Sequence, residues 1–351
     1  MKFNLKTYFQ DIHYSRVKPN IVLKLCLYTG EFFYGNAISL KNLLYKKGIL
    51  KEKRVDAYVI CVGNLTTGGV GKTPITIKLA NEYSKDKKVA VISRGYGSKL
   101  NTKIPQIIKD FDGIKFQNGT ICGDEPFETA KKVGNNTVVI ICKDRYKACK
   151  TAIEKYNSEI IIMDDGFSNR KVKKDKTILV FDSKMKFGNG HMLPFGPLRE
   201  DREEVKRCDE IYIVNKDDVD IGASINEFKT YSKKMYVCEM KPKRIYNSLT
   251  NAEVKINNEE KSKVVAFCAI GQPVQFYNFL KSYYEVITYS FSDHHKYTKN
   301  DIEHLIKLAN KNNTSTFVTT QKDETKIKKY IADYTGYSFN ILELESIIKE
   351  V

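Results

Sequence analysis

The sequence predicts an α/β protein built on a doubly wound parallel sheet, followed by a second, smaller α/β domain. Two observations support this prediction. Short runs rich in Val and Ile, typical of strands buried on both faces, alternate with helical stretches along the middle of the chain. A glycine-rich turn stands between the first of these runs and the helix that follows it, where an open α/β sheet binds its ligands.

The strands and helices of the main domain are predicted from these runs. We expect strands within 57–65, 89–97, 137–143, 159–167, 177–182 and 210–216, and helices within 73–86, 125–133 and 145–156. Repetition of strand, helix and strand predicts a parallel sheet with helices on both faces. Ligands then bind beyond the carboxyl ends of the strands, and the motifs described below fall at those ends.

Changes in composition divide the chain into four parts. They are an N-terminal helical segment (1–50), the main domain (51–240), a charged and turn-rich linker or pair of extended strands (241–262) and a smaller α/β domain (263–345). In the last part we expect strands within 264–270, 285–291 and 314–320, and helices over about 273–284 and 299–310.

The charge balance predicts an anionic partner. The 351 residues include 59 Lys and Arg against 42 Asp and Glu, which gives a net charge of +17. Such a surplus suits nucleic acid, phosphate ligands or an acidic membrane surface. No nucleic-acid recognition motif is present, so nucleic acid is not expected.

The eight cysteines form no CxxC pair and no zinc-spaced cluster, which favours reduced, buried thiols.

The segment 21–50 is apolar and aromatic but is not expected to cross a membrane. Lys24 and Glu31 interrupt it, and its longest uncharged run, Phe32 to Leu40, has nine residues. A transmembrane helix needs about 20 apolar residues. Basic residues flank the segment, so it could lie in an anionic membrane interface. It could equally pack on the main domain, and the sequence leaves both possibilities open.

The turn from Gly63 to Pro74 predicts a phosphate-binding loop of the P-loop NTPase kind. Glycines let backbone N–H groups approach phosphate oxygens, and the helix N-terminus adds its positive dipole. Lys72 would reach the β- and γ-phosphates, and the Thr73 hydroxyl would bind Mg²⁺. The strict pattern has glycine where this chain has Thr66. The predicted nucleotide-binding residues are Thr66, Thr67, Gly68, Gly69, Val70, Gly71, Lys72 and Thr73.

Two acidic pairs stand at the ends of predicted elements. Asp164 and Asp165 end an apolar strand, the pattern of a carboxylate that holds a magnesium ion beside a P-loop. Asp124 and Glu125 stand just before another helix. Either could cap that helix, or could lie beside the phosphates as a base or a metal ligand.

These motifs together resemble the tetraacyldisaccharide 4′-kinases of lipid A biosynthesis. The resemblance runs from about residue 20 to 327, in the family's order, and is carried by VGNLTTGGVGKTP (62–74), SRGYG (93–97), GDEP (123–126), MDDGF (163–167), LPFGPLRE (193–200), AIGQP (269–273), DHHKYT (293–298) and TTQKDETKI (319–327). It implies transfer of the γ-phosphate of ATP to the 4′-hydroxyl of a lipid-linked disaccharide 1-phosphate, forming lipid IVA. It also implies a peripheral or monotopic enzyme at the cytoplasmic face of the bacterial inner membrane, with no obligate protein partner evident.

The resemblance also implies roles for single residues. Asp124 looks like the general base, with His294 as its partner, and this pairing requires the C-terminal domain to close over the phosphates. His295 is an alternative to His294. Glu125 and Asp165 look like Mg²⁺ ligands, with Asp164 nearby, and Lys72 is counted with the catalytic groups. Arg94 and Arg199 are candidates for gripping a phosphate. Where the family usually reads DDGFQH, this chain has Ser168 and Asn169, so contacts from that Gln and His are not expected.

One rival prediction comes from the sequence VNKDD (214–218). N-K-x-D reads guanine in GTPases, so a regulatory GTPase or a partition-type ATPase is the alternative to a kinase. Thr67 stands where a partition ATPase would carry its signature lysine. Competition between GTP and ATP would separate the two classes.

Overall fold

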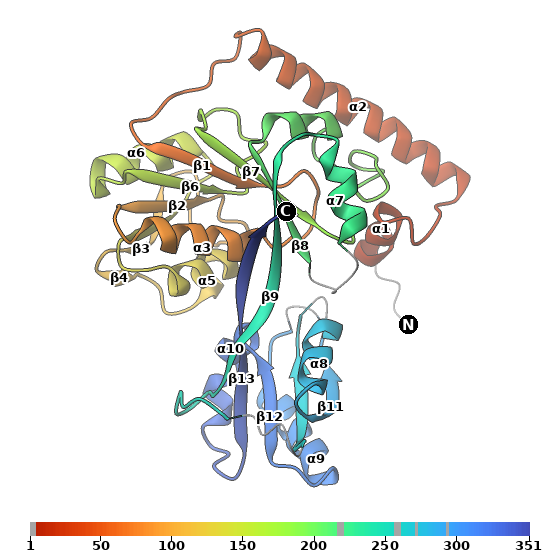
Figure 1. Ribbon diagram of the computed structural model, residues 1–351, viewed down its shortest axis with the longest axis vertical. Coiled ribbons are helices and arrows are strands. Elements are labelled where there is room, and N and C mark those ends of the chain that lie inside the picture. The colour runs from red at the N-terminus through yellow and green to blue at the C-terminus, as the bar shows by residue number, and fades with distance from the viewer. Residues whose placement is uncertain (1–4, 216–220, 256–260, 271–272, 293–294) are drawn as a thin grey trace. The chain divides into compact units, whose positions relative to one another are not determined.

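The structure is a computed structural model that describes residues 5–215, 221–255, 261–270, 273–292 and 295–351 (Figure 1). These residues fold into two compact units. The first unit takes in the chain up to Asn215, residues 221–238 and Ile348–Val351, and the second takes in the described residues between Glu239 and Ile347.

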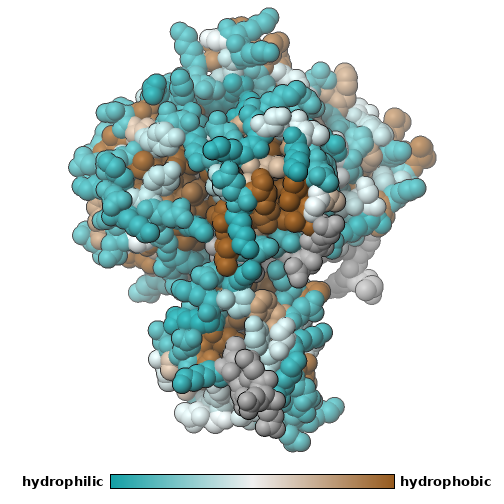
Figure 2. Space-filling view, in the orientation of Figure 1, coloured by the Kyte–Doolittle hydropathy of each residue, from teal (hydrophilic) through white to brown (hydrophobic). Residues whose placement is uncertain are grey.

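Two N-terminal helices, α1 (Leu5–His13) and α2 (Ile21–Lys46), belong to the first unit. Asn20 caps α2, because its side chain accepts a hydrogen bond of 2.8 Å from the Leu23 N–H. Hydrophobic residues gather at the right-hand end of α2 in Figure 2. None of the helices in the described part of the chain combines the length and hydrophobicity of a membrane span, in agreement with the prediction for 21–50.

The sheet of the first unit has its strands in the order β9-β8-β7-β1-β6-β2-β5-β3-β4. Their bounds are β1 (Tyr58–Gly63), β2 (Val89–Ser93), β3 (Gln106–Asp110), β4 (Gly113–Ile114), β5 (Thr137–Ile141), β6 (Ile160–Asp164), β7 (Lys176–Asp182), β8 (Glu210–Asn215) and β9 (Lys234–Asn247). From β8 to β5 the neighbours are parallel. The predicted strands of the main domain all form, and they make the parallel sheet that was expected.

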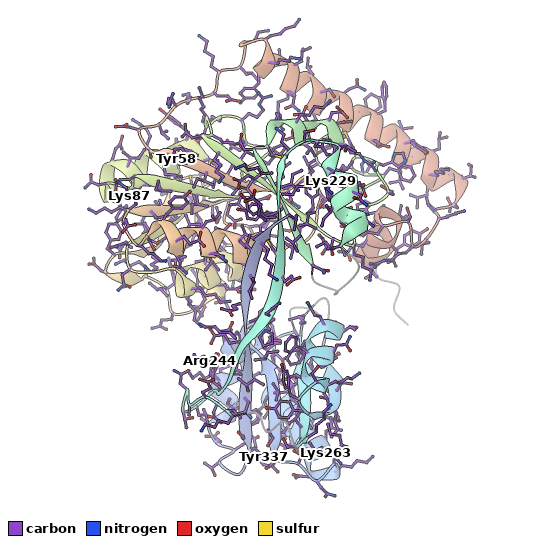
Figure 3. All side chains as sticks on the ribbon, viewed as in Figure 1. Tyr58, Lys87, Lys229, Arg244, Lys263 and Tyr337 are labelled. Carbon is purple, nitrogen blue, oxygen red and sulfur yellow. The ribbon has the colours of Figure 1, made fainter. Side chains whose placement is uncertain are left out.

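The register of the parallel strands brings together the strand ends that carry the motifs. Val62 of β1 pairs with Asp164 of β6, so the loop after Gly63 and the acidic pair begin side by side. Tyr58 and Lys87 mark the opposite, amino edge of the strands in Figure 3. Parallel pairing therefore places the phosphate loop and Asp164 at one edge of the sheet.

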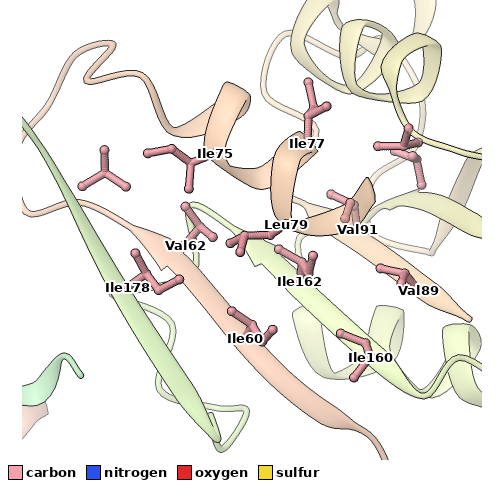
Figure 4. Packing of buried hydrophobic residues seen from close by; sticks show 14 of the residues in the cluster. Ile60, Val62, Ile75, Ile77, Leu79, Val89, Val91, Ile160, Ile162 and Ile178 are labelled. Atoms are coloured by element: carbon pink, nitrogen blue, oxygen red, sulfur yellow. The ribbon is translucent and has the colours of Figure 1, made fainter. Parts of the chain in front are cut away.

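Helices cover both faces of this sheet because successive strand residues point to opposite sides. On one face Ile60 and Val62 pack with residues of α3 (Lys72–Tyr83) and α5 (Asp124–Lys132). Figure 4 shows Ile75 and Leu79 of α3 against that face. The other face, which includes Cys61, packs against α6 (Arg145–Tyr156) and α7 (Gly222–Lys229). The doubly wound arrangement predicted from the sequence is confirmed.

The antiparallel edge of the sheet was not predicted. β3 pairs antiparallel with β5 and with β4, and the β3–β5 register shifts between Ile107 and Lys109. These strands have only five and two residues, and Lys109 and Asp110 interrupt their apolar pattern. Short connecting elements, α4 (Gly119–Cys122) and the 3₁₀ helix η1 (Arg202–Arg207), were not predicted either.

The second unit is a smaller α/β structure with strand order β11-β10-β12-β13-β9. Its elements are β10 (Lys263–Cys268), β11 (Glu285–Ser290), β12 (Thr316–Thr320), β13 (Ser338–Glu350), α8 (Pro273–Lys281), α9 (Lys299–Lys311) and α10 (Gln321–Ile331). The run from β11 to β13 is parallel, and Lys263 and Tyr337 mark its amino edge in Figure 3. The predicted strands and helices of this region are present, whereas α10 and β13 were not predicted.

The stretch predicted as a linker, 241–262, begins inside a strand. Its residues up to Asn247 complete β9, which starts in the first unit and continues into the second. Ile245 and Tyr246 are buried there. Burial of these two side chains explains why a segment with so many charges is part of a sheet.

Candidate active site

The phosphate loop occupies residues 64–71, between β1 and α3. Gly68 and Gly71 have φ angles of +105° and +94°, a region that favours glycine. Gly71 is the N-cap of α3 and offers no side chain to the first turn, so the helix N-terminus is open to an anion. The residues from Thr66 to Thr73 thus have the local structure of an anion cradle.

Lys72 begins α3 and points back across the loop. Its Nζ donates a 2.9 Å hydrogen bond to Asn64 Oδ1 and lies 3.6 Å from Asp165 Oδ1. Asn64 is fully buried, and its Nδ2 donates to the Thr66 carbonyl at 2.6 Å. Asn64 was not predicted as a site residue, although it directly follows the strand. It holds the lysine over the loop.

Asp164 is the buried member of the acidic pair. It ends β6, and Thr76 of α3 donates a weak hydrogen bond of 3.4 Å to its Oδ1. Burial raises the pKa of Asp164 to about 6, although the charge of Lys72 opposes this rise. The neighbouring charges of Asp165 and Glu125 raise the pKa further.

Asp165 is more exposed and is paired with cations. Its φ of +53° is unusual for a residue other than glycine, and such strain is often found at functional sites. Removal from water would raise its pKa, but the hydrogen bonds from Arg199 and the charge of Lys72 hold it well below the ordinary value. The two adjacent carboxyl groups therefore have pKa values shifted in opposite directions.

Arg199 reaches this pair from the segment after β7. Nη1 donates to Asp165 Oδ2 at 2.9 Å, and Nη2 donates to Asp165 Oδ1 at 2.8 Å. Nη2 also donates to the Asn64 carbonyl at 2.9 Å. The buried Nε has no acceptor among the described residues. Arg199, Lys72 and the acidic pair are therefore brought together, as a phosphate site requires.

Asp124 and Glu125 begin α5 and are exposed. Gly123 is the N-cap of α5, so neither acid caps the helix as considered from the sequence, although their position in the first turn suits the helix dipole. In the described part of the chain no three His, Cys, Asp or Glu side chains form a ready metal cluster. A magnesium ion held by one or two carboxylates and substrate phosphates does not need such a cluster.

Two arginines lie on the β2–β5 side of the acidic pair. Arg94 follows β2 and is exposed. Arg145 begins α6, is 4% exposed and donates from Nη1 to the Cys142 carbonyl at 2.7 Å. Burial lowers the pKa of Arg145, while the charges of Asp165 and Asp164 raise it. Arg145 was not predicted, but its place directly after a buried strand was a usable signal.

The residues predicted in the second unit are described only in part. His294 lies outside the described residues, as do Lys216, Asp217 and Asp218 of the N-K-x-D sequence. His295 is described: its Nε2 lies 3.1 Å from Asp301 Oδ2. Its ring also stacks on Phe291 with centroids 4.7 Å apart. His295 thus supports the N-terminus of α9.

The family follows from a comparison with known proteins. The family model described as tetraacyldisaccharide-1-P 4′-kinase, LpxK, matches residues 23–349, nearly the whole chain. The chain belongs to the LpxK family. It is therefore a kinase by family, and the resemblance predicted from the motifs is confirmed.

Individual LpxK relatives match this chain over most of their length. The tetraacyldisaccharide 4′-kinase of Halothermothrix orenii is 35% identical over 323 residues, covering 86% of this chain and 83% of the relative. That of Desulfotalea psychrophila is 32% identical over 314 residues, covering 87% and 88%. LpxK from Aquifex aeolicus, solved in complex with ATP, superposes with a TM-score of 0.71 at 29% identity, covering 93% of this chain and 95% of that one. These matches favour the kinase over the GTPase or partition ATPase.

Proposed function

We propose that the protein transfers the γ-phosphate of ATP to the 4′-hydroxyl of a tetraacyldisaccharide 1-phosphate, forming lipid IVA. The observation that carries the proposal is the meeting of Lys72, Asp165 and Arg199 at a phosphate loop, in a chain of the LpxK family. A structural neighbour of that family was solved with ATP, which supports ATP as the phosphate donor.

The residues present fit a nucleotide triphosphate and its metal. Open N–H groups at the start of α3 and the left-handed glycines suit phosphate oxygens, and Lys72 and Arg199 suit the negative charge. Thr73, Glu125, Asp164 and Asp165 would hold Mg²⁺. Bound there, the ion would neutralise charge that develops on the phosphates. Because cations stabilise ionised carboxylates, the raised pKa of Asp164 would fall in the loaded site.

Asp124 would act as the general base. The oxygen of the 4′-hydroxyl forms a bond to the γ-phosphorus while the bond between that phosphorus and its bridging oxygen breaks, and ADP leaves. A carboxylate at Asp124 accepts the hydroxyl proton. Asp124 is exposed at the start of α5. The role of His294 as its partner stays a prediction.

Arg94 and Arg199 would grip phosphate groups. A guanidinium binds an anion through two parallel hydrogen bonds, the geometry that Arg199 already shows with Asp165. Phosphate binding by Arg199 would replace that ion pair. Arg94 is exposed just after β2, whose Ile92 pairs with Met163 of β6, and it suits the phosphate of the acceptor.

We also infer attachment to an anionic membrane surface, at the cytoplasmic face of the inner membrane. One face of α2 exposes Ile21, Val22, Leu25, Phe32, Phe33 and Leu40, each at least 57% exposed. At 100° per residue these positions fall within an arc of roughly 120°. Exposed lysines at 46, 47, 51 and 53 stand at the end of the helix and just after it, and they suit anionic headgroups.

The test is transfer of label to the sugar. The purified full chain is incubated with γ-labelled ATP, Mg²⁺ and a tetraacyldisaccharide 1-phosphate, with GTP in a parallel reaction. The expected product carries label at the 4′ position and requires ATP. Label that remains on nucleotide and inorganic phosphate alone, or preference for GTP, would contradict the proposal.

A further inference from the structure

Two tyrosine hydroxyls from the N-terminal segment are bonded to the backbone of the phosphate site. Tyr14, which follows α1, donates a 3.2 Å hydrogen bond to the carbonyl of Thr67 in the phosphate loop. Tyr34 of α2 donates a 3.0 Å hydrogen bond to the carbonyl of Arg199. Burial raises the pKa of both tyrosines, which keeps the two hydroxyls protonated as donors.

The two carbonyls belong to segments that are bonded to each other. The Thr67 N–H donates to the Pro197 carbonyl at 2.7 Å, and the Arg199 N–H donates to the Leu65 carbonyl at 2.7 Å. Thr66 and Leu198 form an antiparallel bridge between these bonds. The first half of the phosphate loop and residues 197–199 are therefore one short ladder, with a tyrosine bonded to each strand of it.

The N-terminal helices α1 and α2 are fixed to the same region. Ile12, Leu27 and Phe195 form a buried cluster. Glu31 of α2 accepts a 2.7 Å hydrogen bond from the Met192 N–H. Asn42 of α2 donates to the buried carboxylate of Glu200 at 3.3 Å. Contacts along 192–200 thus fix α2 on the segment that ends at Arg199.

A hydrogen bond to each carbonyl orients a group that the reaction uses. Because a peptide unit is planar, a bond that holds the Thr67 carbonyl also holds the Gly68 N–H of the same plane. Gly68 has a φ of +105°, a conformation that glycine adopts without strain. Because the backbone of a glycine rotates easily, a hydrogen bond from outside the loop is needed to hold that peptide plane. At Arg199 the N–H and the carbonyl are both bonded, which fixes the direction in which the side chain leaves the backbone.

We propose that the N-terminal helices are a positioning element of the nucleotide site, acting through Tyr14 on the phosphate loop and through Tyr34 on Arg199. Neither tyrosine is a catalytic residue. Tyr14 sets the direction of a loop N–H toward the nucleotide phosphates, and Tyr34 sets the aim of the Arg199 guanidinium. The inference rests on the proposed function where it is tested by kcat. Where it is tested by the ATP Kd, it requires only that the chain binds the nucleotide.

The test uses the full chain with Tyr14→Phe, Tyr34→Phe and the control Tyr45→Phe. Tyr45 is also on α2, and its ring, over which the Arg170 guanidinium lies at 4.9 Å, is kept in the control. Loss of one neutral hydrogen bond predicts an effect of about 3- to 10-fold. Tyr14→Phe should raise the ATP Kd by that factor, and Tyr34→Phe should lower kcat by it. Thermal unfolding of the same samples confirms that each variant is folded.

A double substitution separates positioning from general support of the fold. In an Arg199→Ala background, Tyr34→Phe should lower kcat no further, because Tyr34 acts through that side chain. A full additional loss in that background would overturn the inference. So would Tyr14→Phe and Tyr34→Phe variants whose ATP Kd and kcat match those of Tyr45→Phe. If the wild-type chain binds ATP but phosphorylates no sugar, the proposed function fails, and the ATP Kd of Tyr14→Phe still decides the inference.

Discussion

Arg199 and Asp165 form a bidentate ion pair, with nitrogen–oxygen distances of 2.9 and 2.8 Å. Lys72 approaches the same carboxylate at 3.6 Å. Lys72 and Arg199, two cations that suit nucleotide phosphates, are therefore paired with the same acid. The neighbouring Asp164 is buried instead, so adjacent carboxyl groups differ in their protonation behaviour.

This difference predicts that Asp164→Asn stabilises the nucleotide-free protein at alkaline pH. The pKa of Asp164 rises on folding from 3.8 to about 6, so the protonated form stabilises the fold below pH 3.8. That stability is lost as the pH rises through 6, at a cost of about 3 kcal/mol at most. Asparagine imitates the protonated form. Urea unfolding at pH 8 should show the variant more stable than wild type, with a smaller gain at pH 5.

Asp165→Asn is the matched control, with the opposite sign. The pKa of Asp165 is lowered on folding, so its ionised form contributes stability above the ordinary pKa and loses it as the pH falls through the folded value. Without this carboxylate, Arg199 and Lys72 lose the ion pairs that they make with it. The variant should be less stable than wild type at both pH 5 and pH 8. Equal behaviour of the two asparagine variants would contradict the assignment of opposite shifts.

Lys72→Ala should abolish phosphoryl transfer while the protein stays folded. The side chain lies over the phosphate loop and is bonded to Asn64, so its loss removes a charge that suits the β- and γ-phosphates. Activity is measured with labelled ATP, and folding by thermal unfolding. Lys85→Ala, an exposed lysine in the turn after α3, is the control and should keep wild-type activity. Transfer that survives Lys72→Ala would rule out this loop as the catalytic phosphate site.

The sequence predicted the parallel sheet and the loop that we propose binds phosphate because both depend on local patterns. Buried strands such as β1 are continuous apolar runs, and the loop glycines and Asp164 stand directly at strand ends. The seven buried cysteines fit the same logic, since they pack as small hydrophobes, whereas Cys26 on α2 is exposed.

What the sequence could not predict depends on pairing over long distances. The bonds from Tyr14 to Thr67 and from Tyr34 to Arg199 join residues 53 and 165 positions apart, and a lone tyrosine carries no sign of its partner. The short strand β3 forms along the edge that β5 offers, and β4 pairs with β3 in turn. Asn64 looked like part of the loop, and only its contact with Lys72 reveals its role.

Asp124→Ala should lower kcat far more than it weakens ATP binding. A general base contributes about 100- to 10,000-fold to turnover, and it acts on the acceptor hydroxyl and not on the bound nucleotide. The measurements are kcat with saturating lipid and the ATP Kd by titration. Glu125→Ala is the comparison, because the charge of Glu125 acts on Asp164 and Glu125 is proposed to hold Mg²⁺. It should weaken binding of the Mg²⁺–ATP complex as well as turnover. Equal losses of kcat and ATP affinity in Asp124→Ala would instead assign Asp124 to the metal.

The exposed face of α2 should govern binding to lipid vesicles. Val22, Leu25 and Phe32 are 69%, 68% and 66% exposed, although fully burying each such side chain is worth about 1.5–3 kcal/mol. A triple substitution to serine should weaken binding to vesicles that contain anionic lipid by at least about tenfold, even if insertion buries only part of each side chain. Sedimentation with vesicles measures the bound fraction.

The control for α2 removes apolar surface elsewhere on the chain. Ile104 and Val274 are 54% and 65% exposed and lie outside α2, so Ile104→Ser with Val274→Ser should leave vesicle binding unchanged. Added salt should weaken binding of the wild type, because salt screens the attraction between the lysines that follow α2 and the anionic headgroups. If the α2 variant and the control sediment alike, the apolar face of α2 does not bind lipid. If salt alone releases the wild type completely, the basic residues and not that face carry the attachment.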